Sequence, residues 1–584
     1  MKFLSTKRSK VIAAAIIIPV VLVLIVALLV NRYWSPILAD KLRDAVIKGT
    51  DSLYRADFSD AQLHILQGKI MLYNVKLRPD TAVYRRKMKK GLAPNNLIEL
   101  DARRIIVSHI HPFTYFFKKK LDIGQIAINS PHIHISYQLN HKKDTADKDH
   151  RTAWQKMSKS LRSAHVGDIF LDNISFKYDD FSGSKVAVSE IKQMSLHAHD
   201  LLIDSATQTD RSRFFYCKDV TTELKNYSGR TANGLYNYQL KKIKLSTSTS
   251  QVNVVGLSID PVNASTFFAK SRKDKFTVRL DTVQLNNFDF LTYQKYRSLT
   301  ASSLIIKGGT LDLYNNPNKI PNNKDKIESF PNVAIYQMQT DLKIDSVRIK
   351  RLEFRYSELG KSSKKTGTLV FANTRALFLN VTTSPSALKN NSIATAQISS
   401  YFMNRGRLDV SFRFDLNNKN AAYSYKGHLG AMNLEGINSI TTPLALVKIT
   451  SGKLTSYDFN ISGNNKFAKG HIALLYNDLK IKLLKRDEEN DMLKRKLIPT
   501  LFANIFILKH NNPDNAGEKP RTFDVVYQRP KNAPFFKTAW QTMLLGLKPS
   551  VGLDAKTEAS VKQRMAKSEK KNKDKQDKKD EKKK

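Results

Sequence analysis

The chain has a single cysteine, Cys217, among its 584 residues, so it cannot form an internal disulfide. Acidic residues are scarce: 52 Asp and Glu stand against 97 Lys and Arg, which gives a formal net charge of +45. The sequence contains no glycine-rich dinucleotide fingerprint, and it lacks the nucleophile elbow of hydrolases. These absences exclude a disulfide scaffold and remove the common local signatures of catalysis. They leave open an enzyme whose site is assembled from distant segments.

Long apolar runs are also missing, with one exception at residues 11–30, where every residue is apolar. A helix of about 20 such residues matches the hydrocarbon thickness of a bilayer. The run ends in Asn31-Arg32-Tyr33-Trp34, without the small residues that precede a signal-peptide cleavage site. We therefore predict an uncleaved transmembrane anchor. Basic residues flank both ends almost equally, but the short basic segment 1–10 favours a cytoplasmic N-terminus, with the rest of the chain on the far side.

The positive charge is spread over the chain and is not concentrated in its tail. A distributed charge fits anionic headgroups or a polyanionic cell surface at least as well as a nucleic-acid groove, and general solubility explains it equally well. The stretch 115–120 places Tyr-Phe-Phe before three lysines. It fits base stacking, contact with a membrane surface, or simply a strand end beside a basic loop. We predict a membrane partner and no nucleic-acid partner.

An apolar spacing of twelve residues recurs along the chain. Starting from Val166, apolar residues follow at Ile169, Leu171, Ile174, Phe176 and Tyr178. The same offsets start at Ile344 and, with one proline, at Ile123. Each copy holds two runs of period two, typical of half-buried strands, joined by mostly polar residues. Strand, tight turn, strand is the first interpretation, and a β-bulge within one strand is the second. The starts at 123 and 166, and those at 301 and 344, lie 43 residues apart, which indicates a repeated module.

Composition divides the chain into segments. After the anchor, Ser35-Pro36 begins a predicted linking helix, and strand patterns then continue to the lysine-rich end. The expected organisation is a basic segment at 1–10, the anchor at 11–30, a linking helix at 34–54, a repetitive β region at 55–440 with a polar insert near 140–160, a C-terminal β region at 441–553 with an amphipathic helix at 535–547, and a disordered tail at 554–584.

Histidines offer the main candidates for chemistry. Three His-x-His pairs occur, at 109/111, 132/134 and 197/199, and residues two apart on a strand share a face. No carboxylate or cysteine stands at a convincing spacing from them, so we predict no metal. Gly360-Lys361-Ser362 ends like a phosphate-binding loop, but Arg355 occupies the position that requires glycine. We predict no catalytic residue and no cofactor.

Three stretches, at 66–77, 121–135 and 470–483, resemble AsmA-like envelope proteins. In the last stretch Gly470, Tyr476, Asp478 and Leu479 match a glycine, a tyrosine and an aspartate-leucine pair that recur in related proteins. The resemblance covers most of residues 1–550. The basic tail and the polar insert from Asn140 depart from it.

The resemblance implies a single-pass inner-membrane protein with its bulk in the periplasm of a Gram-negative cell. The implied fold is mainly β, an elongated, bent antiparallel sheet that forms an apolar groove, with a few short amphipathic helices. The implied role is non-enzymatic, in outer-membrane biogenesis and phospholipid transport, with other envelope proteins as further partners. The candidate apolar lining consists of Ile126, Ile128, Ile169, Leu171, Val347, Ile349, Phe412 and Phe414.

Three alternatives stay open. The apolar faces can pack on each other in a closed sandwich or barrel, which would leave no groove. The chain can serve as a scaffold that binds envelope partners or anionic polymers through its basic surface. It can also be an envelope hydrolase with dispersed site residues, for which His132 and His134 are the first residues to test.

Overall fold

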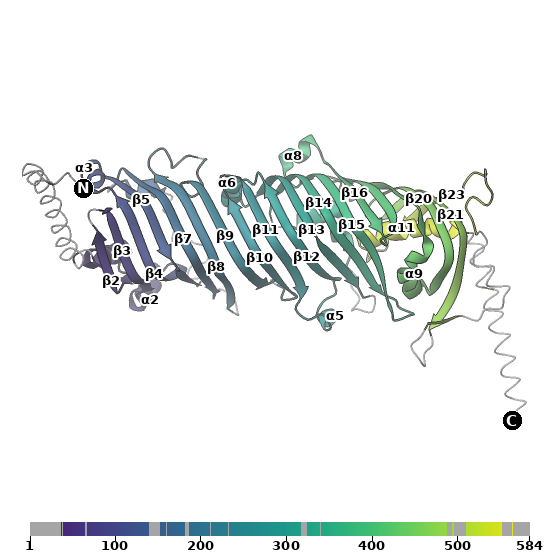
Figure 1. Cartoon of the computed structure of the whole chain (residues 1–584), viewed down its shortest axis with the longest axis horizontal. Coiled ribbons are helices and arrows are strands. Elements are labelled where there is room, and N and C mark those ends of the chain that lie inside the picture. The colour runs from purple at the N-terminus through teal and green to yellow at the C-terminus, as the bar shows by residue number, and fades with distance from the viewer. Residues whose placement is uncertain are drawn as a thin grey trace, which may run out of the picture. The chain divides into compact units, whose positions relative to one another are not determined.

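The computed structural model describes most of the chain after the predicted anchor (Figure 1). The described residues are 37, 39–64, 67–138, 152–158, 161–181, 186–210, 212–231, 233–316, 324–338, 340–486, 493–495, 510–551 and 563. The predicted membrane span at 11–30 and nearly all of the tail at 554–584 lie outside them. Among the described residues, no helix is long and apolar enough to cross a bilayer.

Strands dominate the described chain, which confirms the mainly β class. The chain forms two compact units: unit 1 comprises residues 1–229 and 239–255, and unit 2 comprises 230–238 and 256–584. The elements up to the boundary are β1 (Tyr54–Asp57), β2 (Asp60–His64), β3 (Lys69–Pro79), α2 (Thr81–Lys89), β4 (Asn96–Ile110), α3 (Pro112–Lys118), β5 (Lys120–Asn129), β6 (His132–Tyr137), α4 (Ala153–Met157), β7 (Ser163–Asp180), β8 (Ala187–Ile203), β9 (Cys217–Arg230), β10 (Tyr236–Ser246) and β11 (Gln251–Pro261).

Unit 2 continues the β architecture and adds more helices. Its elements are α5 (Phe267–Lys270), β12 (Lys275–Asn286), α6 (Phe290–Tyr296), β13 (Leu299–Asn315), η3 (Lys326–Ser329), α7 (Pro331–Ala334), η4 (Ile335–Gln337), β14 (Leu342–Leu359), β15 (Thr366–Thr382), α8 (Pro385–Asn390), β16 (Ile393–Phe402), β17 (Gly406–Asp415), β18 (Tyr423–Leu429), β19 (Met432–Asn433), η5 (Leu434–Ile437), α9 (Asn438–Ala445), β20 (Val447–Gly463), β21 (Phe467–Arg486), β22 (Leu493–Arg495), β23 (Thr522–Gln528) and α11 (Phe535–Ser550).

The expectation of a purely antiparallel sheet is wrong, because the sheet is mixed. Strands β5 and β6 both pair in parallel with β7, and β13 pairs in parallel with β14. Ile123 is registered with Val166, and Ala301 with Ile344. The 43-residue offset in the sequence is therefore the parallel register itself. A helix precedes the first strand of two of these three parallel pairs, α3 before β5 and α6 before β13.

For the copies that start at Val166 and Ile344, the strand-turn-strand interpretation is also wrong and the bulge interpretation is right. The copy that starts at Ile123 is divided at Ser130-Pro131 between β5 and β6, which both pair with β7. β7 runs unbroken from Ser163 to Asp180, and its register with β8 shifts on both sides of Ile174. Asn173, just before the shift, has the left-handed φ of 53°. A bulge adds one residue and flips the alternation of the strand. Ile174 and Phe176 therefore return to the face used by Ile169 and Leu171, so one apolar face continues along the strand.

The core of each unit lies on this apolar face. In unit 1, residues 39–49 form a helix within the predicted linking segment, and Ala39 and Leu42 pack against Leu72 and Ile105 of the sheet. In unit 2 the core is larger, because α11 and α9 pack over strands β14–β21 and exclude water from them. The predicted amphipathic helix at 535–547 is α11, which extends to Ser550.

Candidate functional site

Unit 1 presents two apolar rows that cross seven strands. Residues paired across strands share a face, so each row can be followed through the registers. The first row is Leu63, Ile70, Val107, Ile126, Ile169, Ala198 and Val220. The second row is Ala61, Leu72, Ile105, Ile128, Leu171, Leu196 and Thr222. Eleven of these fourteen side chains stay half-buried, since the structure describes a covering helix over only one end of this face.

Unit 2 continues the pattern over ten strands. The first row is Leu285, Leu304, Val347, Phe378, Ala396, Phe412, Tyr425, Ile461, Gly470 and Val525. The second is Val283, Ile306, Ile349, Ala376, Ile398, Val410, Gly427, Phe459, Ile472 and Phe523. All members are apolar apart from the tyrosine hydroxyl. Each unit therefore has one continuous apolar sheet face.

All eight candidate lining residues lie on these faces. Ile126 with Ile169 and Ile128 with Leu171 are registered pairs in unit 1. In unit 2, Val347, Ile349 and Phe412 belong to the two rows, and Phe414 pairs with Ala394 and Tyr423 in the next row. The first six and Phe412 are half-buried, whereas Phe414 is fully packed in the core.

Beneath α11, the apolar face of unit 2 encloses a cavity of about 250 Å³. Strands β15–β18, β20 and β21 supply its floor, and α11 supplies its roof. Thr441 is the one lining residue with an aliphatic hydroxyl, and the rest of the wall is aliphatic or aromatic. The side chains nearest the helix include Phe412, Tyr425, Tyr457, Trp540 and Met543. An apolar wall of this kind favours hydrocarbon over water.

Three tyrosines of the sheet fasten the roof of this cavity. The hydroxyl of Tyr425 donates to the carbonyl of Ala539 (3.1 Å), and that of Tyr457 donates to Met543 (2.9 Å). Tyr476 donates to the carbonyl of Ser550 (3.0 Å) at the last residue of α11. Burial raises the pKa of Tyr476 to about 12, so its hydroxyl stays protonated and can donate throughout the physiological range. Each tyrosine thus places its ring in the core and its hydroxyl on the helix backbone.

The four residues that match the sequence motif, Gly470, Tyr476, Asp478 and Leu479, all lie on β21, and Tyr476 contacts the end of α11. Gly470 allows close approach of β20, because a Cβ there would lie 2.1 Å from the carbonyl oxygen of Asn460. Tyr476 is fully buried. Asp478 has a left-handed φ of 55°, which turns the strand so that the backbone of Leu479 bonds with the carbonyl of His510 at 3.0 Å. These residues therefore shape the part of the sheet on which the end of α11 packs.

Two buried polar side chains that were not predicted from the sequence, Asn512 and Arg529, hold the two ends of β23. The amide of Asn512 bonds with the carbonyl of Leu474 and with both the N–H and the carbonyl of Arg521, at 2.5 to 3.0 Å. Arg529, whose side chain is 1 % exposed, donates to Asp325 and to the carbonyls of Asn465, Lys531 and Ala533. These contacts hold the segment before α11 against the sheet. For Asn512, the sequence offered one signal, a polar residue directly before a proline in Asn512-Pro513.

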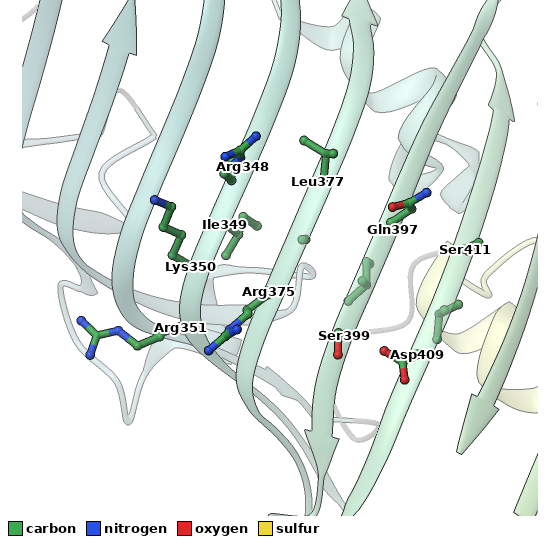
Figure 2. Close-up of a pocket in the computed structure, with 13 residues that line it drawn as sticks. Arg348, Ile349, Lys350, Arg351, Arg375, Leu377, Gln397, Ser399, Asp409 and Ser411 are labelled. Carbon is green, nitrogen blue, oxygen red and sulfur yellow. The ribbon is translucent and has the colours of Figure 1, made fainter. Parts of the chain in front are cut away.

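The opposite face of unit 2 is polar and carries an open hollow of about 710 Å³ over β14–β17 (Figure 2). Arg348, Lys350, Arg351 and Arg375 line it, and Figure 2 shows their side chains on the same side of the sheet as Gln397 and Asp409. Within the described residues, none of the four cations forms an ion pair, whereas Asp409 pairs with Arg407 at 2.9 Å. The hollow is therefore an electropositive surface.

The histidine pairs lie on the other face of unit 1 or at its strand ends and bind aspartates. Asp168 accepts hydrogen bonds from both His197 (3.0 Å) and His199 (2.9 Å), which lower its pKa. His134 bonds to Asp179 at 2.8 Å. Among the described residues no group of three or more ligands can hold a metal. The carboxylates of unit 1 with lowered pKa are Asp51, Asp80, Asp168, Asp179, Asp200, Asp210, Asp219 and Glu223.

The remaining histidines of the three pairs have other neighbours. His132 bonds with Ser175, and His111 lies 3.2 Å from Asp122. His109 has a left-handed φ of 56°. His132 and His134 therefore have separate partners. Comparison with known proteins adds no assignment, because no protein-family model and no curated protein matches this sequence.

Proposed function

We propose that this protein binds the acyl chains of phospholipids along its apolar sheet faces and passes them between membranes of a cell envelope. The observation that carries the proposal is the set of registered apolar rows, which continue across seven strands in unit 1 and ten in unit 2. Membership of the AsmA-like group, an inner-membrane anchor at 11–30, a periplasmic body and an elongated, bent groove belong to the same proposal.

The half-buried state of the rows in unit 1 supports this role. Each methylene that leaves water for an apolar surface contributes about 0.8 kcal/mol, so a sheet face of this kind can compete for an acyl chain. Bulges keep the apolar residues on one face along the full length of β7 and β14. A chain in contact with such a face can slide from row to row without breaking a specific polar contact.

The cavity beneath α11 serves a narrower role in this proposal. Its volume of about 250 Å³ lies below the ~300–1,000 Å³ typical of pockets that enclose a whole small ligand. It can accept part of an acyl chain and leaves no room for a complete phospholipid. We therefore assign transport to the open apolar rows and regard the cavity as a terminal position for a chain end.

Lipid retention tests the proposal. The full-length protein is purified under mild conditions, and its bound lipids are identified by mass spectrometry beside a control protein from the same host. We expect stoichiometric phospholipid. The variant Ile126→Glu/Ile169→Glu places two charges in the first row of unit 1 and should lose most of that lipid. Gln125→Glu adds charge to the other face of the same strand and should retain it.

A lipid-free wild-type protein with the circular dichroism of an intact β fold would refute the proposal. Equal retention by the two variants would refute it as well, since it would place the lipid elsewhere.

A scaffold function is the second candidate, and the electropositive hollow of Figure 2 favours it. Four cations without an ion pair in the described chain provide a site for an anionic polymer. Binding of a polyphosphate chain that weakens steeply with salt, together with loss on Arg348→Gln/Arg375→Gln, would support this function. Unchanged binding by that variant would exclude the hollow as its site.

A further inference from the structure

The connection between β4 and β5 in unit 1 is a short helix, α3, with an exposed aromatic surface. Phe117 and Phe113 are 81 % and 74 % exposed, more than any other large apolar side chain in the described residues. Their rings stack with centroids 6.4 Å apart, and Tyr115 lies between them in sequence with 48 % exposure. These three aromatics, the α3 aromatic tip, present to solvent the kind of side chain that folding normally buries.

The fold itself does not require this exposure. The helix α6 occupies the corresponding place in unit 2, between β12 and the first strand of a parallel pair. Its first residue, Phe290, is 7 % exposed and packs edge-on against Phe288 at 4.8 Å. The same kind of connection can therefore bury its leading aromatic. In α3, Phe113 and Phe117 instead belong to none of the core clusters.

Three consecutive lysines follow the aromatic tip. Lys118, Lys119 and Lys120 are all exposed, and none of them forms an ion pair with a described residue. Lys119 ends the helix in a left-handed conformation with φ of 53°, and β5 begins at Lys120. Positive charge is thus concentrated directly beside the exposed rings.

We propose that α3 docks into the interface of a bilayer that contains anionic phospholipid. Aromatic rings favour the boundary between headgroups and acyl chains, and lysines beside them favour anionic headgroups at about 1 kcal/mol each. The docking does not depend on whether the sheet carries lipid, so it goes beyond the function proposed above. It adds a second contact between the body of the protein and a membrane, besides the predicted anchor.

The size of the patch favours a membrane over a protein partner. Two phenylalanines and a tyrosine can together contribute at most roughly 450–750 Å², which is below the ~800 Å² that each partner contributes to a standard protein interface. Shallow insertion into a bilayer has no such area requirement, because the charged headgroups supply the remaining attraction.

A single fluorophore tests the docking. The buried Cys217 is the one cysteine of the chain, so Cys217→Ala gives a background in which Tyr115→Cys carries the only thiol. An environment-sensitive nitrobenzoxadiazole label is attached there in the full-length protein, which is mixed with phosphatidylcholine vesicles with or without phosphatidylglycerol. Some vesicles contain nitroxide-labelled lipid as a quencher. The matched control carries the label at Tyr296→Cys at the end of α6, where the native side chain is 64 % exposed.

We expect a blue-shifted, strongly quenched signal at 115 in anionic vesicles, little quenching at 296, and a smaller effect at 115 without phosphatidylglycerol. Phe113→Ser/Phe117→Ser should lower the docked-to-free ratio at least about tenfold, because two apolar rings are lost. Lys118→Gln/Lys120→Gln should lower it about twentyfold, from roughly fivefold per lysine. These side chains are exposed, so circular dichroism should show an unchanged fold.

Equal quenching at 115 and 296 in anionic vesicles would overturn the proposal. A label at position 115 that shifts to the blue with added RNA or protein, but not with vesicles, would also overturn it. A wild-type protein that retains no lipid but still docks to anionic vesicles would refute the transport proposal and leave the docking proposal standing. The two inferences can therefore be tested separately.

Discussion

Tyr476→Phe removes the hydroxyl of a fully buried tyrosine on β21, next to the last residue of α11. That hydroxyl donates to the carbonyl of Ser550, the last residue of α11. The last four carbonyls of a helix have no partner within it, so the Ser550 carbonyl depends on an outside donor. Tyr425→Phe is a matched control, because its acceptor, the carbonyl of Ala539, lies inside the helix and keeps its intrahelical hydrogen bond.

The two substitutions should therefore differ in magnitude. Loss of an ordinary hydrogen bond costs about 0.5–1.5 kcal/mol, whereas leaving a buried acceptor without a partner costs about 1–3 kcal/mol. If the helix exchanges its amide protons by undocking, these values correspond to about 2- to 12-fold faster exchange for Tyr425→Phe and about 5- to 150-fold for Tyr476→Phe. Both rings stay in place, so the apolar core is unchanged.

Hydrogen exchange followed by mass spectrometry, on peptides that cover Phe535–Ser550, measures this difference. Fluorescence of Trp540, on the same helix, gives a second reading of undocking. No acceleration in Tyr476→Phe would show that its hydroxyl does not hold the roof, and equal acceleration in the two variants would refute the distinction between a terminal and an internal carbonyl.

Three further outcomes follow from the structure. Gly470→Ala should cost about 1–3 kcal/mol in urea unfolding, because its Cβ would clash with the backbone of Asn460 and Ile461. Arg529→Leu should cost about 2–6 kcal/mol by the same measurement, since it leaves the carbonyls of Asn465 and Ala533 without this donor at about 1–3 kcal/mol each. Acid should unfold unit 1 first: its eight carboxylates with lowered pKa stabilise the folded state above about pH 4, and this stability is lost as pH falls through their folded pKa values. Asp409 is the one carboxylate with a lowered pKa among the described residues of unit 2. Limited proteolysis at low pH checks this order, and cleavage of unit 2 before unit 1 would contradict the acid-unfolding prediction.

The sequence predicted the strands and their apolar side well, because period-two alternation reports directly which residues share a face. It also contained the parallel register, because Ile123 and Val166, whose apolar patterns match, are paired between β5 and β7. It did not predict that some neighbouring strands run parallel, or that the apolar spacing lies within one bulged strand. A spacing of three between apolar residues is compatible with a turn or a bulge, and only the partner strand, with Asn173 in a left-handed conformation, decides between them.

The closure of the cavity was beyond sequence reasoning for a different reason. Tyr425, Tyr457 and Tyr476 are ordinary strand tyrosines in the sequence, and their role depends on a helix more than 70 residues further along the chain. Arg529 likewise bonds to Asp325, which lies 204 residues before it. Contacts at such separations leave no periodic signal. The exposed rings of α3 were visible as a motif, but their exposure required knowledge of the core.

The bulges also explain how long strands of similar composition find a single alignment. Slipping one strand by one residue would turn every apolar side chain of its rows toward water and would also move its bulge away from that of its neighbour. In unit 1, Gly124 and Gly167 lie so close that a Cβ on the second would meet the carbonyl oxygen of the first at 2.6 Å, so larger residues cannot occupy this crossing. The close contact between the two glycines therefore fixes the register of β5 against β7. Apolar residues elsewhere on these strands can change without changing this register.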